Sequence, residues 1–357
     1  MPPDALGQAF RFRRGHVMLI LYLGDLHFSG WSMRGRIALR EKQIPFEERV
    51  VELDWPTTEN ADGVLVAGDL PEQREARFGC QCAFGDLLAL DRESLLPGSV
   101  AEALPRVPIL VNTGTCTVAT DVVSIAEYLD EMAPNSDVRL MGSTPALRAR
   151  IRSLCAWASH DLPSLINGAS YAKSLRPQPP SPAEACAVEQ ARWVCETVAA
   201  LLRGYGGPYA VGEFSLVDIM LSPLFQQMTG WRIPIADDAV GEYAGRLLER
   251  PSISSHLDEA KAIYRAIANA EVGSPQWILC HYRYNQSQRL LHDWQTDICQ
   301  RVSNATAEMV ITLAYAGATV EQIATIVSTE YGAPRTQVSL EIRNLMDRLD
   351  PRQERAA

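Results

Sequence analysis

Two serines near the start of the chain, Ser29 and Ser32, stand where hydroxyl groups could stabilise an anion. An apolar β-type run, residues 19–23, precedes them, and the pattern predicts a helix that begins near Met33 after a short polar loop. The first N–H groups of a helix lack partners within it and lie at the positive end of its dipole. The segment therefore predicts a site suited to an anion such as a thiolate.

The residues around this junction resemble the signature of glutathione transferases, specifically the serine-type, zeta-like maleylacetoacetate isomerases. That signature is a Ser-rich turn running into an Arg-x-Arg-Ile-Ala-Leu helix, here Ser29-Gly30-Trp31-Ser32 and then Arg34-Gly35-Arg36-Ile37-Ala38-Leu39. Val107-Pro108-Ile109-Leu110 stands where thioredoxin-like proteins carry a cis proline. The resemblance implies an α/β thioredoxin-like domain, an all-α C-terminal domain and glutathione as the cofactor.

The resemblance also implies which residues hold and activate glutathione. Ser29 aligns with the first serine of the signature and is the leading candidate to donate its hydroxyl proton to the thiolate. Ser32 is the second candidate, with helix capping as its alternative role. Trp31 lies in the same turn and is also expected to bind the cofactor. The main chain of Val107, before Pro108, is expected to hold the cysteinyl part of glutathione.

The γ-glutamyl site departs from the family pattern. The family places an acidic residue followed by Ser before an Ile-Ala-Glu-Tyr-Leu helix, whereas this chain has Asp121 and then Val122. The carboxylate is kept and the hydroxyl is lost. A lost hydrogen bond to a charged group costs about 1.5–3 kcal/mol, which corresponds to tenfold or more in affinity.

Four further residues are candidates for substrate contact: His27 in the active loop, Arg34 on the following helix, and Trp157 and His160 further along the chain. Arg34, together with Arg36, could attract a carboxylate, with a solvated helix face as the alternative. A lone His or Trp on a helix more often serves packing or lies on the surface. No Cys or His spacing supports a metal site.

The chain divides into four predicted parts. Residues 1–16 form a loose tail, and residues 17–135 form the thioredoxin-like domain, with its second strand expected at residues 49–53 and an unusual insertion at 56–104. Residues 144–269 form the all-α domain, and residues 274–350 form a small α+β domain. A capping box is expected to start one helix in each of them, Ser215 with Asp218 in the first and Thr319 with Gln322 in the second. The insertion, with a possible helix over 72–84, is expected to be a lid or a partner surface, with plain decoration as the alternative.

The last segment is predicted to contain three strands followed by three helices. It resembles the PqqD-like domains, winged-helix-like modules that bind leader peptides of ribosomally made natural products. The sequence segments that carry this resemblance include Val302-Ser303-Asn304-Ala305-Thr306-Ala307-Glu308 and Ala318-Thr319-Val320-Glu321-Gln322-Ile323-Ala324. A DNA-binding winged helix is the first rival, but this segment is not basic, as a DNA reader should be. A plain interaction module is the second rival.

Composition narrows the class of protein. With 357 residues, two or three domains are expected, and a net charge of -10 argues against a sequence-independent nucleic-acid binder. No apolar run approaches the roughly 20 residues of a membrane helix. Eight scattered cysteines without a secretion signal indicate a reducing cytoplasm. The family resemblance implies a homodimer.

Together these features predict a glutathione-dependent enzyme, a transferase or isomerase, that tailors a precursor peptide recruited by its C-terminal domain. Its expected step is addition of the glutathione thiol to an electrophilic residue, with glutathione-assisted isomerisation also open. One rival is a catalytically silent scaffold that delivers the leader peptide to other enzymes. The other is an ordinary small-molecule transferase whose last domain only mediates association.

Overall fold

The computed structural model describes only part of the chain, and the descriptions below concern that part. It comprises residues 19–27, 29–50, 57–59, 65–67, 107–115, 117–176, 182–269, 282–285, 290–293, 299–301, 309–311, 313, 319–332 and 334–348. Three predictions lie outside the described residues: the 1–16 tail, most of the 56–104 insertion and the possible helix over 72–84.

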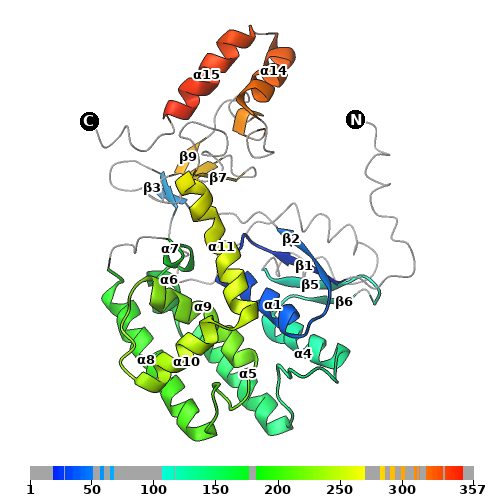
Figure 1. Ribbon diagram of the computed structural model, residues 1–357, viewed down its shortest axis with the longest axis vertical. Coiled ribbons are helices and arrows are strands. Elements are labelled where there is room, and N and C mark those ends of the chain that lie inside the picture. Colours follow the sequence, from blue (N-terminus) through cyan, green and yellow to red (C-terminus); the bar gives the residue numbers. More distant parts are fainter. Residues whose placement is uncertain are drawn as a thin grey trace.

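A four-stranded mixed sheet organises the N-terminal region (Figure 1). Its strands stand in the order β2-β1-β5-β6, and their bounds are β1 Leu19–Leu23, β2 Phe46–Val50, β5 Ile109–Asn112 and β6 Thr117–Ala119. Strand β1 runs parallel to β2 and antiparallel to β5. Helices α1 (Gly30–Glu41) and α4 (Val122–Met132) pack against each other beside this sheet. This is the thioredoxin-like arrangement that the sequence predicts.

Two boundaries in this region differ from the prediction. Helix α1 begins at Gly30, not near Met33, because Ser29 and not Ser32 is its N-cap. Strand β2 begins at Phe46 rather than Arg49, so it pairs along the full length of β1. The described part of the insertion is an antiparallel hairpin of β3 (Thr57–Glu59) and β4 (Leu65–Ala67), which the sequence analysis does not predict.

The second region is helical, as the sequence predicts. Its helices are α5 Pro145–His160, α6 Pro163–Gly168, α7 Tyr171–Ser174, α8 Ala185–Tyr205, α9 Leu216–Gly230, α10 Asp238–Leu248 and α11 Pro251–Asn269. Helix α9 lies at the centre, with every residue from Leu216 to Met228 buried. Its predicted capping box is confirmed, since Ser215 accepts from the main chain while the Asp218 carboxylate accepts from the Ser215 N–H.

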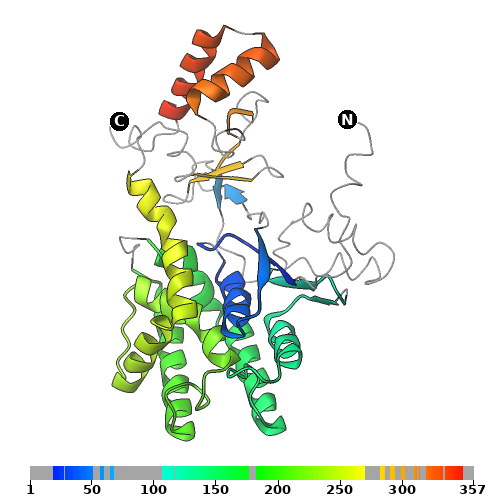
Figure 2. The same cartoon turned by 45° about the vertical axis from the view of Figure 1, so that its right-hand side comes forward.

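A small third region lies beyond the end of α11 (Figure 2). Strands β7 (Tyr282–Asn285), β8 (Leu290–Asp293) and β9 (Cys299–Arg301) form an antiparallel sheet in that order, and β4 of the insertion contacts β9. Helices α14 (Val320–Tyr331) and α15 (Arg335–Arg348) pack together through buried Ile323, Val327, Val338 and Ile342. The predicted capping box of Thr319 and Gln322 is confirmed.

In the described ranges, no helix combines the length and the apolar character that crossing a membrane requires.

Candidate site at the N-termini of α1 and α4

Ser29 occupies the position that the sequence predicts for a hydroxyl donor. It is the N-cap of α1, and its Oγ accepts from the Ser32 N–H at 3.1 Å. Because the oxygen accepts this bond, the hydroxyl proton remains able to donate to an anion. The residue is 7% exposed, and the positive end of the α1 dipole lies beside it. Ser29 can therefore donate to a thiolate at the helix start.

Ser32 serves the fold. It is completely buried, and its Oγ accepts from the Gly24 N–H at 2.9 Å, which ties the end of β1 to the first turn of α1. A ligand has no access to a hydroxyl in this position. The geometry therefore favours Ser29 over Ser32 as the donor. Helix capping, the alternative role expected for Ser32, is performed by Ser29 instead.

The Val107-Pro108 peptide bond is cis, as the sequence predicts. Pro108 packs directly against α1, because a Cβ atom built on Gly35 would lie 2.8 Å from the Pro108 ring. This close approach brings the main chain at Val107 against the helix that carries Ser29.

The predicted γ-glutamyl position lies at the start of α4. Asp121 is the N-cap, and its Oδ1 accepts from the N–H groups of Val123 at 2.7 Å and Ser124 at 3.4 Å. Val122 is buried in the hydrophobic core, and its side chain offers no polar group to a ligand. The helix start therefore presents one carboxylate and no neighbouring hydroxyl from position 122.

Arg34 belongs to α1 and is not solvated. It is 2% exposed, and its Cζ lies 4.2 Å from the centroid of the Trp31 ring. Within the described part of the chain, its Nε and Nη1 have no hydrogen-bond partner. Burial lowers the pKa of Arg34 to about 10, an effect opposed by nearby Cys155 and Asp121, so the guanidinium is charged at neutral pH. The alternative of a solvated helix face is wrong for Arg34.

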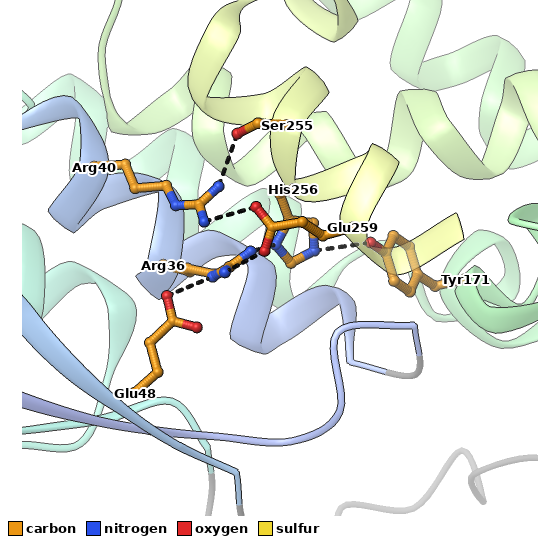
Figure 3. A network of polar contacts seen from close by, with 7 residues as sticks. All are labelled: Arg36, Arg40, Glu48, Tyr171, Ser255, His256 and Glu259. Atoms are coloured by element: carbon orange, nitrogen blue, oxygen red, sulfur yellow. Dashed lines mark hydrogen bonds and ion pairs between the residues drawn. The ribbon is translucent and has the colours of Figure 1, made fainter. Parts of the chain in front are cut away.

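Arg36 is also buried, but it is fully engaged (Figure 3). Its Nε donates to Glu48 at 2.7 Å, and its Nη2 donates to Glu259 of α11 at 2.5 Å. Its Nη1 lies 3.3 Å from Nδ1 of His256. Because a guanidinium only donates, Nδ1 must accept, which leaves the His256 proton on Nε2. The alternative of a solvated helix face is therefore wrong for Arg36 too. Its side chain joins α1 to α11.

This network reaches the turn that carries Ser29. The Tyr171 hydroxyl lies 3.3 Å from Nε2 of His256, so the imidazole donates to it (Figure 3). A Cβ atom built on Gly30 would lie 3.4 Å from the Tyr171 ring and 3.2 Å from Pro223. Tyr171 and Pro223 thus pack against the turn that carries Ser29, called the active turn below, and His256 is hydrogen-bonded to Tyr171. Sequence reasoning missed them because no local pattern links residues so far apart in the chain.

The remaining predicted substrate residues stand in different surroundings. His27 is buried in the turn before Ser29, and burial lowers its pKa to about 3, so the ring is neutral. Trp157 makes an edge-to-face contact with Trp193 of α8, with ring centroids 5.7 Å apart. His160 is exposed at the C-terminal end of α5. Among the described polar contacts, none links Trp157 or His160 to Ser29. Among the described residues, no group of three His, Cys, Asp or Glu side chains could hold a metal ion.

Comparison with known proteins agrees with this description of the N-terminal region. Residues 28–132 match the model of the family described as "Glutathione S-transferase, N-terminal domain". With the sheet order β2-β1-β5-β6, the match assigns this region to the thioredoxin-like fold of glutathione transferases. No curated protein matches the chain.

Several solved structures are similar to residues that make up about two-thirds of the chain. A glutathione transferase homologue from Burkholderia, solved with bound glutathione, is 18% identical, with 68% of this chain and 98% of that chain covered and a TM-score of 0.43. The tau class glutathione S-transferase of mango is 16% identical, with 70% and 96% covered and a TM-score of 0.44. A rice glutathione S-transferase in complex with glutathione is 17% identical, with 71% and 96% covered and a TM-score of 0.41.

Proposed function

We propose that the N-terminal region binds glutathione and activates its thiol, with Ser29 as the donor. The observation that carries this proposal is the Ser29 hydroxyl, which stands at the N-terminus of α1 with its oxygen engaged by the Ser32 N–H and its proton available. The family match over residues 28–132 and the glutathione bound to two similar structures support the choice of thiol.

The chemistry follows from charge. A hydroxyl that donates to the thiolate favours the ionised form, as does the positive end of a helix dipole, so both lower the thiol pKa. The main chain of Val107, beside the cis Pro108, is the proposed contact for the cysteinyl part. Neutral His27 lies two residues before Ser29, where it adds no positive charge to the site.

We further propose that the activated thiol acts on a precursor peptide held by the C-terminal region. Support comes from the element order there, an antiparallel sheet in the order β7-β8-β9 followed by helices α14 and α15, which pack together. A sheet edge can bind an extended peptide as an added strand, and joining such a module to a catalytic domain raises the local concentration of the peptide. The proposed steps remain thiol addition or glutathione-assisted isomerisation, in a homodimeric assembly.

Replacing Ser29 tests the first proposal. Ser29→Ala is expected to raise the pKa of the bound thiol and to weaken binding of the thiolate, measured by calorimetry and by the ultraviolet absorbance of the thiolate across pH. Because Ser29→Ala also removes a helix cap, which costs about 0.5–2 kcal/mol of stability, a matched control is needed. Thr144→Ala removes the cap of α5, where Oγ1 accepts from the Leu147 N–H, far from the site.

Ser29→Thr should restore the thiol pKa, since it keeps both the cap and the donor. A wild-type protein that shows no heat of glutathione binding contradicts the proposal and favours the silent scaffold, a role that buried Val122 at the γ-glutamyl position also allows.

The peptide proposal has a separate test. The full-length protein is mixed with glutathione and a precursor peptide encoded beside its gene, with and without the leader. The expected result is a mass increase of one glutathione only when the leader is present. Equal modification of small electrophiles and of leaderless peptide would favour the ordinary small-molecule transferase.

A further inference from the structure

The position of the Ser29 hydroxyl depends on how the active turn is held. The Ser29 N–H donates to the Asp25 carbonyl at 3.0 Å, so the residues between them form one closed unit with Ser29. A hydroxyl must meet a thiolate within narrow limits of distance and angle, because hydrogen bonds weaken steeply away from their preferred geometry. The groups that contact this turn therefore decide how well Ser29 can donate.

His256 of α11 contacts the active turn by two routes, although it belongs to the helical region. The main chain of Leu26, inside the turn, forms a hydrogen bond with the His256 ring. The second route passes through Tyr171, whose hydroxyl lies 3.3 Å from Nε2 of His256 and whose ring packs against Gly30. One residue of the helical region thus acts on the turn both before and after Ser29.

The orientation of the His256 ring is itself fixed (Figure 3). The side chain is completely buried, and its Nδ1 lies 3.3 Å from Nη1 of Arg36. Arg36 is held in turn by Glu48 at 2.7 Å and Glu259 at 2.5 Å. Because a guanidinium can only donate, the contact with Arg36 keeps the imidazole proton on Nε2, the nitrogen that faces Tyr171.

Stability alone does not account for a buried polar network at this junction. Well-packed apolar residues of similar volume often replace buried ion pairs without loss of stability. What a satisfied polar network adds is a single fixed arrangement of its members. The ring adds no charge, because burial and the charges of Arg36 and Arg40 lower the pKa of His256 to about 3. The network is therefore suited to setting geometry at the turn.

We propose that His256 is a positioning residue for Ser29 and acts through hydrogen bonds, not through charge. By fixing Leu26 and Tyr171, the ring holds the active turn where the Ser29 hydroxyl can donate to the thiol. This inference rests on the proposed function, in which Ser29 is the donor. It makes the helical region part of the site, because α11 supplies the residue that orients the turn.

The thiol pKa of glutathione bound to the full-length protein measures this effect, read from the ultraviolet absorbance of the thiolate across pH. Ser29→Ala removes a hydrogen bond to a charged group, which corresponds to a rise in this pKa of about 1 to 2. His256→Leu keeps an apolar side chain of similar size and should raise the thiol pKa by part of that amount, about 0.5 to 1. His256→Gln, whose amide can both donate and accept, should restore most of the wild-type value.

A double variant tests whether His256 acts through Ser29. In the Ser29→Ala background, His256→Leu should leave the thiol pKa unchanged, because the donor that the ring positions is already gone. Ser255→Ala is the matched control. The Ser255 hydroxyl accepts from Arg40 at 2.8 Å, so this variant also removes an uncharged contact between α11 and α1, yet its thiol pKa should equal that of the wild type.

Tyr171→Phe gives a second readout that does not depend on how well His256→Leu folds. It removes one oxygen atom from the network and keeps the ring that packs against Gly30. The thiol pKa should rise in this variant as well, by less than in His256→Leu, and the rise should again vanish in the Ser29→Ala background.

The outcomes separate this inference from the proposed function. If the wild type does not bind glutathione or does not lower its thiol pKa, both are rejected. If the wild type lowers the thiol pKa and Ser29→Ala raises it, but His256→Leu and Tyr171→Phe keep the wild-type value, only the positioning role is rejected. Equal rises from His256→Leu with and without the Ser29 hydroxyl would also reject it, because the effect would not pass through Ser29.

Discussion

His256 is uncharged in the folded protein, although it stands at the junction of two domains. Burial lowers its pKa to about 3, and the charges of Arg36 and Arg40 act in the same direction. Neutrality is what the hydrogen bonds require, since Nδ1 must accept from Arg36 while Nε2 donates to Tyr171. Protonation would place a third positive charge beside the two arginines.

This histidine predicts how stability depends on pH. The unfolded chain binds a proton near pH 6.5, whereas folded His256 stays neutral down to about pH 3, so the unfolded state binds more protons between these values. Stability must therefore fall as pH is lowered through this window, by about 1.4 kcal/mol per pH unit for one such histidine. Urea unfolding at pH 7, 6 and 5 measures the slope.

His256→Gln keeps a polar group in place and removes the titration, so its slope should be shallower than that of the wild type by this amount. Equal slopes would contradict the assignment. His27, whose pKa burial also lowers to about 3, contributes in the same direction and remains in both proteins.

At the scale of single residues, the sequence identifies which residue types are present better than it identifies their roles. Ser29 and Asp121 are predictable because each precedes a helix and its function depends on that local position. The burial of Arg34 is not predictable, because it depends on how other elements, among them α4, pack against α1 in the folded chain. The same holds for Tyr171 and His256, which meet the active turn only in the folded chain.

At the scale of elements, contact between α1 and the cis-proline loop sets the geometry of the site. Gly35 permits this contact, since any Cβ atom there would lie 2.8 Å from Pro108. Ala favours a helix by about 1 kcal/mol over Gly, but overpacking typically costs 1–3 kcal/mol, so the clash should prevail.

Gly35→Ala is therefore expected to lower the free energy of unfolding by up to about 2 kcal/mol and to weaken glutathione binding, because α1 must shift away from Val107. Gly245→Ala is the control. It lies in α10, where an added Cβ atom meets nothing within 4 Å, and it should stabilise the protein by about 0.5–1 kcal/mol. Chemical denaturation and calorimetry distinguish the two. Stabilisation by both substitutions would contradict this prediction, because it would show that the cis-proline loop moves to make room for the added Cβ atom.

Elements with strong local signals are the ones the sequence predicts well. The capping boxes at Ser215 and Thr319 start α9 and α14 at the expected residues. The start of α1 is misplaced by three residues because Ser29 and Ser32 are both suitable caps and only packing selects between them. The β3–β4 hairpin is missed since its strands are only three residues long.

At the scale of the molecule, ion pairs connect α1 to the N-terminal half of α11 and to the residue before it. Glu259 accepts from both Arg36 and Arg40 (Figure 3). Glu41 accepts from Arg250, which lies directly before α11. The Arg36 side chain is only 5% exposed, whereas Glu48 and Glu259 are 30% and 43% exposed. The arginine is thus the desolvated member of the group, and its partners can regain water if it is removed.

Arg36→Met should consequently cost about 1–3 kcal/mol of stability, less than the 3–5 kcal/mol typical of a fully buried pair. The exposed pair of Arg152 and Glu127 provides the comparison, and Arg152→Met should cost less than about 1 kcal/mol. Urea denaturation monitored by tryptophan fluorescence gives both values. Equal losses would mean that the interface is held by apolar packing alone.

The succession of an α/β region, a helical region and a final region with strands is predictable in outline, because the helical pattern and the final strands differ clearly in periodicity. The family of the C-terminal region stays a prediction. The proximity of the insertion hairpin to β9 is not readable from sequence, since more than two hundred residues separate them.

The length of helix α11 also sets a distance between the active turn and the C-terminal region. His256 marks the level of the active turn, and Asn269, the last residue of the helix, lies about 20 Å further along its axis at 1.5 Å per residue. A peptide anchored beyond that end must cover this distance before any of its side chains meets the thiol. At about 3.3 Å per extended residue, at least six residues would separate the anchored segment from the first modifiable position.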